Sequence, residues 1–192
     1  IEDSSEAFGS SINKKKIGTF GQINVTSIRS EKMIGVGEGG ILTFNSKNLY
    51  EKAKLIASRH APFRRGKDPY WKKYFSNGEG YNYLMPHLLG AVARGQIETF
   101  KNKMLKKKIL VGKSYRKILE SNEVSMTQDI LRGFVPVFWL NSIYFKNLNK
   151  NQVTKIGESL MKKGIEVRSG FWPLNKQKGF KFKYINGLNS TT

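Results

Sequence analysis

Short apolar runs alternate with helical patterns in the first part of the chain. A β-branched run bounded by glycine and serine predicts a strand over residues 23–28, and GGILTF predicts a second strand over residues 39–44. Asn45 and Ser46 then offer a helix cap. Apolar residues recur behind this cap at helical spacing, namely Leu49, Ala53, Ile56 and Ala57. This pattern predicts two strands followed by a helix.

The middle of the chain predicts a long loop and a long helix. Residues 61–80 are rich in proline, glycine, arginine and lysine, and loops of that length tend to be functional or mobile. From Pro86 an apolar stripe predicts a helix that runs to about Glu120 and could bridge two lobes. The stripe consists of Leu88, Leu89, Val92, Ala93, Gln96, Ile97, Phe100 and Met104.

The last third of the chain combines short predicted strands with one predicted helix. Residues 134–140 read as a strand, and residues 149–163 read as a helix that stops at Gly164. Further strands are predicted over residues 165–168 and 180–185. Together these elements predict an α+β unit.

Composition narrows the classes of function. The 34 lysines and arginines exceed the 14 acidic residues, so the net charge is +20, which attracts polyanions. Much of this charge lies in residues 101–108, where Met104, Leu105 and Ile109 keep a helical spacing. The lysines are therefore expected on the solvated face of an amphipathic helix, and nucleic-acid binding is not expected as the main function.

Several kinds of site are excluded by residue type. The chain has no cysteine, which rules out disulfides, zinc-thiolate sites and cysteine nucleophiles. Its two histidines, His60 and His87, are too few and too separated for a metal site. No apolar run approaches the roughly 18 residues of a membrane span, and no signal pattern is present. We expect a protein that acts in the cytoplasm.

The run SEKMIGVGEGG at 30–40 places Lys32 between a strand-like segment and a glycine-dense turn. A lysine so placed can reach into a cleft and form an imine with a carbonyl. Asp3 could pair with a pyridine nitrogen and Ser27 could bind a phosphate, which completes the requirements of pyridoxal phosphate. Strand ends at one edge of an open α/β sheet are where such groups converge. Taken singly, a lysine among 34 basic residues is nearly always solvated, a residue placed like Asp3 is usually on the surface, and Ser27 is equally a turn or edge residue.

Five segments, in order, carry a resemblance to a known family. The chain resembles the pyridoxal-phosphate-dependent nucleotide-sugar aminotransferases of the DegT/DnrJ type. The matching segments are IEDSSEAFGS at 1–10, IGTFGQINVTS at 17–27, SEKMIGVGEGG at 30–40, EGYNYLMPHLLGAVARGQIE at 79–98 and GIEVRSGFWPL at 164–174.

The resemblance implies a role for each matched residue. Lys32 would hold the cofactor as the internal aldimine and act as acid and base, and Asp3 would pair with the pyridine nitrogen. Glu6 would lie near the ring hydroxyl or ring face, and Ser27 would bind the cofactor phosphate. Asn82 would reach the cofactor phosphate of a partner subunit. The resemblance implies this role because members of the family resemble one another in forming homodimers with each site at the interface.

The resemblance also implies a fold and a reaction. Residues 1–104 would form the C-terminal half of an aspartate-aminotransferase-like α/β major domain with the bridging helix, and residues 105–192 a small α+β domain. Lysine at position 32, where some dehydratase relatives have histidine, points to transamination. Glutamate would be the amino donor and a nucleotide-linked ketosugar the acceptor, in amino-sugar biosynthesis for a polysaccharide or glycan.

Two departures from the family pattern bear on this interpretation. Leu84 stands where the family usually has arginine after Gly-Tyr-Asn-Tyr. The family's N-terminal half, with its phosphate loop and stacking aromatic ring, has no counterpart in residues 1–192, so we expect a fragment or one part of a split enzyme. The alternative is an inactive remnant that acts as a basic interaction or polyanion-binding module.

Overall fold

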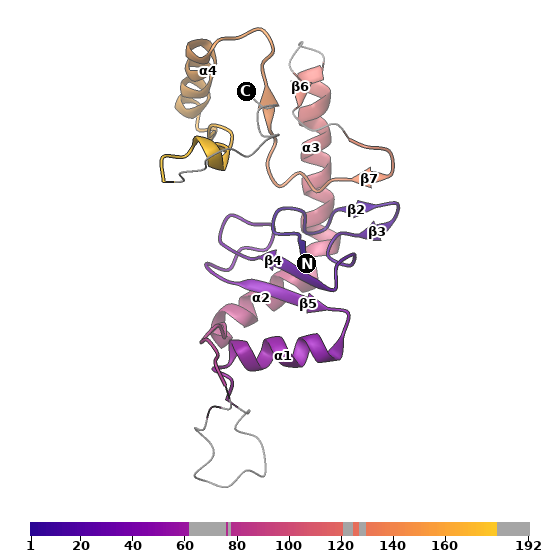
Figure 1. The fold of residues 1–192 in the computed structure, drawn as a ribbon. Helices are drawn as coiled ribbons and strands as arrows, with labels where there is room; N and C mark the ends of the chain where they lie inside the picture. The colour runs from indigo at the N-terminus through magenta and orange to yellow at the C-terminus, as the bar shows by residue number, and fades with distance from the viewer. Residues whose placement is uncertain (62–75, 77, 121–124, 127–129, 180–192) are drawn as a thin grey trace. The chain divides into compact units, whose positions relative to one another are not determined.

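The structure is a computed structural model that describes residues 1–61, 76, 78–120, 125–126 and 130–179. The chain divides into two compact units, Ile1–Asn141 and Ser142–Thr192, which we describe separately (Figure 1). The domain boundary predicted between residues 104 and 105 falls where one helical element passes directly into the next. That division into domains stays a prediction.

Three strands form a mixed sheet in the first unit. The order is β1 (Glu2–Asp3), β4 (Ile23–Ser27) and β5 (Gly40–Phe44). β1 runs parallel to β4, and β5 runs antiparallel to it with Ser27 opposite Gly40. The two strands predicted from the sequence are therefore confirmed, each one residue shorter than expected.

A second, antiparallel sheet joins β2 (Ser11–Ile12) to β3 (Lys15–Lys16) and to β7 (Phe134–Val135). The strand predicted over 134–140 is wrong beyond Val135. The chain leaves the sheet there, and Phe138 adopts a positive φ of 52°, which extended backbone does not allow. A further two-residue strand, β6 (Ser125–Met126), precedes this segment.

The first predicted helix is confirmed as α1 (Lys47–Ala57). Ser46 occupies the N-cap position with an extended backbone, as its residue type favours. Its side chain makes no capping hydrogen bond, so the expected cap is present in position only.

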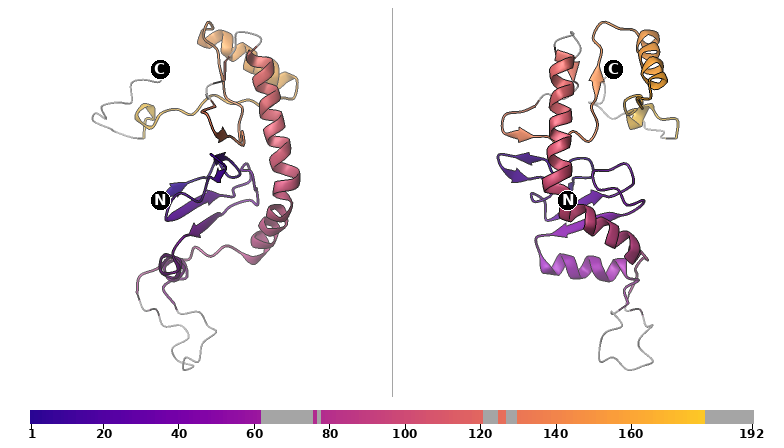
Figure 2. Two further views of the ribbon diagram at one scale, coloured as in Figure 1. Left: turned by 90° about the vertical axis from the view of Figure 1, so that its right-hand side faces the viewer. Right: turned by 180° about the vertical axis from the view of Figure 1, so that it is seen from behind.

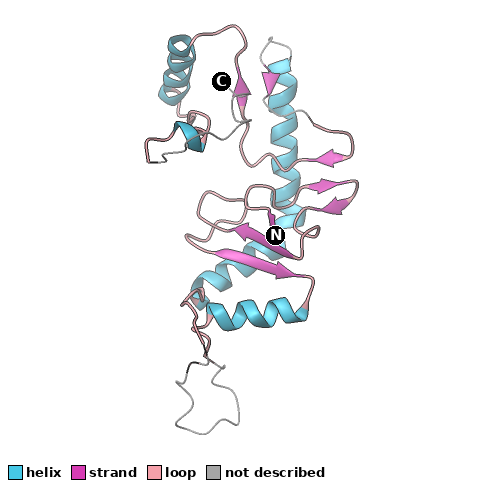
Figure 3. Cartoon of the chain, in the orientation of Figure 1, coloured by secondary structure: helices cyan, strands magenta, loops and turns pink. Residues whose placement is uncertain are grey.

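The long helix predicted from Pro86 consists of three consecutive helical segments. They are α2 (His87–Thr99), a π-helical turn η2 (Phe100–Met104) and α3 (Leu105–Glu120). Figure 3 draws the helices of the chain in cyan. Figure 2 shows α2 beside the β4–β5 strands. Of the predicted stripe, Ala93 and Phe100 are buried. Leu88 is 75% exposed, so the apolar stripe is wider than the face that this unit buries.

The hydrophobic core lies between the segment after β4 and the long helix. Its buried members are Ile28, Met33, Ile34, Val36, Ala93, Phe100 and Val137. Four of these seven come from residues 28–36, which surround Lys32 in the sequence. The core therefore fixes the lysine-bearing segment rather than only the strands.

The second unit contains β8 (Ile143–Tyr144), α4 (Lys150–Lys162) and the 3₁₀ turn η3 (Leu174–Lys176). Asn149 and Gln152 form a reciprocal capping box at the start of α4. The predicted stop at Gly164 is confirmed: it has φ +78°, and the N–H of Ile165 donates to the carbonyl of Leu160 at 3.0 Å.

The strand predicted over residues 165–168 is wrong, because this backbone is irregular. A strand needs a neighbouring strand for its backbone groups, and the described residues of this unit provide none beside it. The strand predicted over 180–185 and most of the loop predicted over 61–80 lie outside the described residues.

Candidate functional site

Lys32 lies at the tip of a loop that continues the β4–β5 pair. The N–H of Ile28 donates to the carbonyl of Gly39 at 3.1 Å, and the N–H of Ser30 donates to that of Gly37 at 2.9 Å. Beyond these two rungs the chain folds back, and the N–H of Val36 donates to the carbonyl of Ile28 at 3.0 Å. We call residues 28–39 the lysine loop.

The lysine loop is anchored by its own side chains and by α2. Met33 and Ile34, directly after Lys32, are buried in the core. The Gln96 amide accepts from the N–H of Gly35 at 3.1 Å and donates to the Gly35 carbonyl at 2.7 Å. A Cβ at Gly35 would collide with the Ser30 carbonyl, so only glycine fits there. The backbone that carries Lys32 is therefore fixed on both sides.

The Lys32 amine meets a carboxylate and an aromatic ring. Its Nζ donates to Glu6 Oε1 at 3.1 Å and lies 3.7 Å from the centroid of the Trp139 ring. The Lys32 side chain is 12% exposed, whereas that of Glu6 is 53% exposed. Sequence analysis predicted Glu6 at this site but missed Trp139. The interior of an apparent apolar strand gives no sign that its tryptophan meets a lysine more than a hundred positions away in the chain.

Asp3 ends β1, next to the strand that leads to Lys32. Its Oδ1 accepts from the N–H of Ser5 at 2.9 Å. The pKa of the Asp3 carboxyl lies below its ordinary value because the Ser5 side chain and the Ser5 N–H donate to it, with a smaller contribution from the positive charge of Lys32. Asp3 therefore carries its negative charge over a wider pH range than a free carboxyl group.

The register of β1 and β4 places Asp3 and Ser27 on one face of the sheet. Asp3 is opposite Val25, and Ser27 is two positions further along β4. Since side chains alternate between faces with period two, both point to the same side. The Ser27 hydroxyl accepts a weak hydrogen bond from the N–H of Arg29 at 3.4 Å. The structure thus brings Lys32, Asp3, Glu6 and Ser27 to one end of β1 and β4.

Asn82 lies elsewhere. It forms an isolated β-bridge with Ser58, after α1, and its side chain is exposed. The rings of its neighbours Tyr81 and Tyr83 stack with centroids 5.0 Å apart. Among the described residues, no hydrogen bond joins Asn82 to Lys32, Asp3 or Ser27.

Two polar arrangements that the sequence analysis missed support the strand ends. Ser4, Asn24 and Thr26 are buried on the opposite face of β1 and β4 and hydrogen-bond to one another over 2.7–3.1 Å. If Ser4 donates to Asn24, Asn24 to Thr26 and Thr26 to Ser4, each hydroxyl donates once and accepts once. This closed ring joins β1 to β4 directly beside Asp3.

The second arrangement is formed by the Glu2 carboxylate. It accepts from the backbone N–H groups of Gly18, Phe20 and Gly21 at 2.6, 2.8 and 2.9 Å. These bonds, that of Gly21 first, hold the pKa of Glu2 below its ordinary value. Glu2 thereby ties the loop before β4 to β1.

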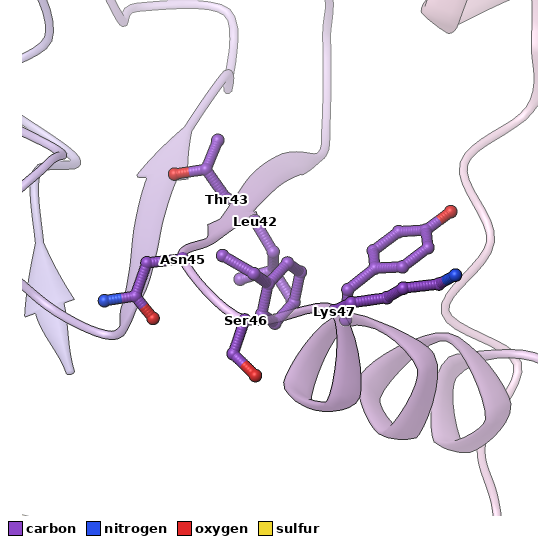
Figure 4. Close-up of a pocket in the computed structure, with 7 residues that line it drawn as sticks. Leu42, Thr43, Asn45, Ser46 and Lys47 are labelled. Atoms are coloured by element: carbon purple, nitrogen blue, oxygen red, sulfur yellow. The ribbon is translucent and has the colours of Figure 1, made fainter.

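A shallow hollow lies at the other end of the sheet, where β5 enters α1 (Figure 4). It measures about 430 Å³ and is lined by Leu42, Thr43, Phe44, Asn45, Ser46, Lys47 and Tyr50. Because Phe44 is opposite Ile23 and Gly40 is opposite Ser27, this hollow is at the strand end remote from the lysine loop. We assign it no part in the chemistry of Lys32.

Other kinds of site find no support in the part of the chain that the structure describes. Its histidines and carboxylates form no group of three that could hold a metal ion. None of its helices combines the length and apolar character needed to cross a bilayer.

Two curated proteins are similar in sequence to nearly the whole of this chain. The GDP-perosamine synthase of Escherichia coli O157:H7 is 28% identical over 184 residues, which cover 96% of this chain and 47% of that protein. The GDP-perosamine synthase of Caulobacter vibrioides is 30% identical over 179 residues, covering 91% and 45%. The chain thus spans just under half the length of these relatives.

A solved structure shows the same relation. Helicobacter pylori PseC, an aminotransferase involved in the biosynthesis of pseudoaminic acid, superposes with a TM-score of 0.78 at 26% identity. The match covers 92% of this chain and 46% of that protein. Residues 1–190 match the family model itself. The chain therefore belongs to the DegT/DnrJ/EryC1/StrS aminotransferase family.

Proposed function

We propose that this chain supplies the lysine-bearing part of a pyridoxal-phosphate-dependent aminotransferase. Its substrate would be a nucleotide-linked ketosugar, its amino donor glutamate, and its product an amino sugar for polysaccharide or glycan synthesis. One observation carries the proposal: a primary amine, 12% exposed, is fixed by an anchored loop at the strand end next to an ionised carboxylate. The sugar-nucleotide class is supported by the names of the relatives, GDP-perosamine synthases.

The residues of the site fit pyridoxal phosphate chemically. The cofactor needs a primary amine for its aldehyde, a carboxylate for its ring nitrogen and polar donors for its phosphate. We assign these roles to Lys32, Asp3 and Ser27, with Glu6 beside the ring. The lowered pKa of Asp3 supports its role, since only the ionised carboxylate can hold a proton on the ring nitrogen.

When bound, the cofactor supplies the electron sink that makes amine exchange between an amino acid and a ketosugar possible. The protein's own part is to hold and move protons. Lys32 would hold the cofactor through its Nζ and would take and return a proton at the reacting carbon. Met33 and Ile34 are buried, and a movement of the lysine loop would expose them. Their burial therefore holds the backbone that carries the Lys32 amine in place.

Asn82 is proposed to serve the site of a partner subunit in a homodimer. Its exposed side chain and its position apart from Lys32 support such a role, since a residue that reaches another subunit must face outward. Leu84, 55% exposed beside it, cannot replace the positive charge of the arginine found in relatives.

Borohydride trapping with peptide mapping tests the assignment of Lys32. The chain is mixed with increasing pyridoxal phosphate, reduced and digested, and the pyridoxyl mass is measured on each lysine. We expect Lys32 to be labelled at the lowest cofactor concentration. Lys32→Ala should remove that early label, while Lys113→Ala, on the exposed face of α3, should leave it unchanged. If Lys32 is labelled no earlier than Lys113, the assignment is wrong.

A further inference from the structure

The surroundings of Lys32 contain one contact to which the proposed reaction gives no role. The Nζ of Lys32 lies 3.7 Å from the centroid of the Trp139 ring while it also contacts Glu6. An ammonium group over an indole face is attracted by the negative face of the ring, and this attraction grows as water is excluded. The Lys32 side chain is only 12% exposed, so water screens this cation–π attraction less than it would at an exposed site.

Trp139 is fixed with respect to the lysine loop. Its Nε1–H donates to the carbonyl of Glu31, the residue before Lys32, at 2.7 Å. Its own carbonyl accepts from Lys108 Nζ on α3 at 3.4 Å. The indole is therefore positioned relative to the same backbone that carries the amine.

The segment that leads to Trp139 is held in the core. Val137 is 2% exposed and Phe138 is 6% exposed, and the N–H of Val137 donates to the Ser10 hydroxyl at 3.0 Å. Gly112 on α3 gives the Phe138 ring its space, since a Cβ there would overlap that ring. The backbone that leads to the indole is therefore held beside α3 at Phe138.

We propose that the Trp139 face and the Glu6 carboxylate form a docking site for the Lys32 ammonium whenever the amine is free. This inference rests on the proposed function, in which the amine alternates between attachment and release. Trp139 is a positioning residue in this account, because it acts through Lys32. The ring confines the released side chain to one orientation, and the exposed carboxylate gives a weaker, screened contribution.

The docking site gives a spectroscopic signature that needs no cofactor. Protons on the Lys32 Cε over an indole face should resonate upfield of those of other lysines. In a carbon–proton spectrum of the chain with labelled lysine, we expect one shifted Cε signal that Lys32→Arg removes. Absence of such a signal from the wild-type chain would overturn the proposal without any need for a variant to fold.

Acylation kinetics test the contribution of the ring. Lys32 acylation is measured by mass spectrometry relative to Lys113 in the wild type, Trp139→Leu, Trp139→Phe and Glu6→Gln. We expect Trp139→Leu to accelerate Lys32 about fivefold, and Trp139→Phe, which keeps a ring, to restore most of the protection. Glu6→Gln should change the rate less than Trp139→Leu.

The acylation rates of the two Trp139 variants distinguish docking of the ammonium on the ring from a purely structural role of the indole. If Trp139→Phe accelerates Lys32 as much as Trp139→Leu, the indole acts only through its hydrogen bond to Glu31, and the proposal is wrong. If Trp139→Leu does not fold, the comparison of Trp139→Phe with wild type and the wild-type spectrum still decide. Failure of borohydride trapping with an intact upfield signal would count against the proposed function and not against the docking site.

Discussion

At the scale of single residues, surroundings distinguish groups of one chemical type. Lys15 lies over the Phe20 ring at 4.3 Å, as Lys32 lies over Trp139, but Lys15 and Phe20 are both exposed. Lys32 differs because the two residues that follow it, Met33 and Ile34, are buried and its own side chain is only 12% exposed. Asp3 and Glu2 are adjacent carboxylates, yet one ends a strand beside the lysine loop and the other binds three backbone N–H groups.

Glu2→Gln tests this structural role. Loss of the charge weakens three charge-assisted hydrogen bonds, so we expect a stability loss of about 1–2 kcal/mol at pH 7 by urea denaturation. Because the folded state lowers the pKa of Glu2, its contribution is present above the unfolded-state value near 4.5 and is lost as pH falls through the lower folded value. The free energies of unfolding of the variant and the wild type should therefore become equal at acid pH.

Glu51→Gln, on the exposed face of α1, is the matched control for Glu2→Gln and should be close to neutral. A Glu2→Gln effect that persists unchanged at low pH would show that shape, not charge, explains the loss.

At the scale of elements, hydrogen bonds at the ends of loops and helices determine where each segment ends. The lysine loop is short because two backbone rungs and the Gln96 amide close it, and α4 is bounded by a capping box and by Gly164. The Gly164 backbone has φ +78°. Gly157 lies inside α4, where an added Cβ would meet only the Val167 side chain, at 3.6 Å.

These two glycines, one inside α4 and one just after its end, predict opposite outcomes for the same substitution to alanine. Gly164→Ala should lower stability by about 1 kcal/mol, because alanine is strained at positive φ. Gly157→Ala should raise helix stability by about 0.5–1 kcal/mol, because glycine is a poor helix former. Thermal denaturation followed by circular dichroism at 222 nm, with both variants compared to wild type, measures the pair. The same sign for both would contradict the assigned end of α4.

At the scale of the whole molecule, the chain spans just under half the length of the curated relatives that it matches. Large apolar side chains are exposed on its long helix, Leu88 at 75% and Leu110 at 66%. We propose that such faces pack against further polypeptide in the working enzyme. The family's phosphate-binding loop and stacking ring would come from there.

This proposal predicts weak cofactor binding by residues 1–192 alone. We expect a dissociation constant above about 100 µM in an absorbance titration, since only part of the phosphate contacts is present. Lys32→Ala should abolish the change in absorbance that remains. Tight, stoichiometric binding by the chain alone would contradict the proposal.

The remnant alternative makes a different prediction at the same scale. A polyanion-binding module with net charge +20 would bind nucleic acid with an affinity that falls steeply as salt rises. Binding of this kind, together with borohydride labelling spread evenly over the lysines, would favour the remnant. An upstream reading frame for the other half would favour the enzyme.

The sequence by itself determined the elements whose cause is local. The β-branched run of β4, the apolar stripe of α2 and the glycine stop of α4 were predicted because neighbouring residues cause them. The same local reasoning failed for residues 136–140 and 165–168, which were predicted as strand but have irregular backbone. Whether such a segment is extended depends on a partner strand, which sequence spacing does not reveal.

Only the tertiary structure decided the surroundings of Lys32. Local pattern and family resemblance pointed to Lys32, Asp3, Glu6 and Ser27, and the register of β1 and β4 explains why the strand ends meet. Trp139, the Gln96 amide and the buried Ser4 ring escaped notice because each contact joins residues distant in sequence. The physical reason is that burial and packing, which determine what an amine touches, are properties of the folded chain and not of any short segment.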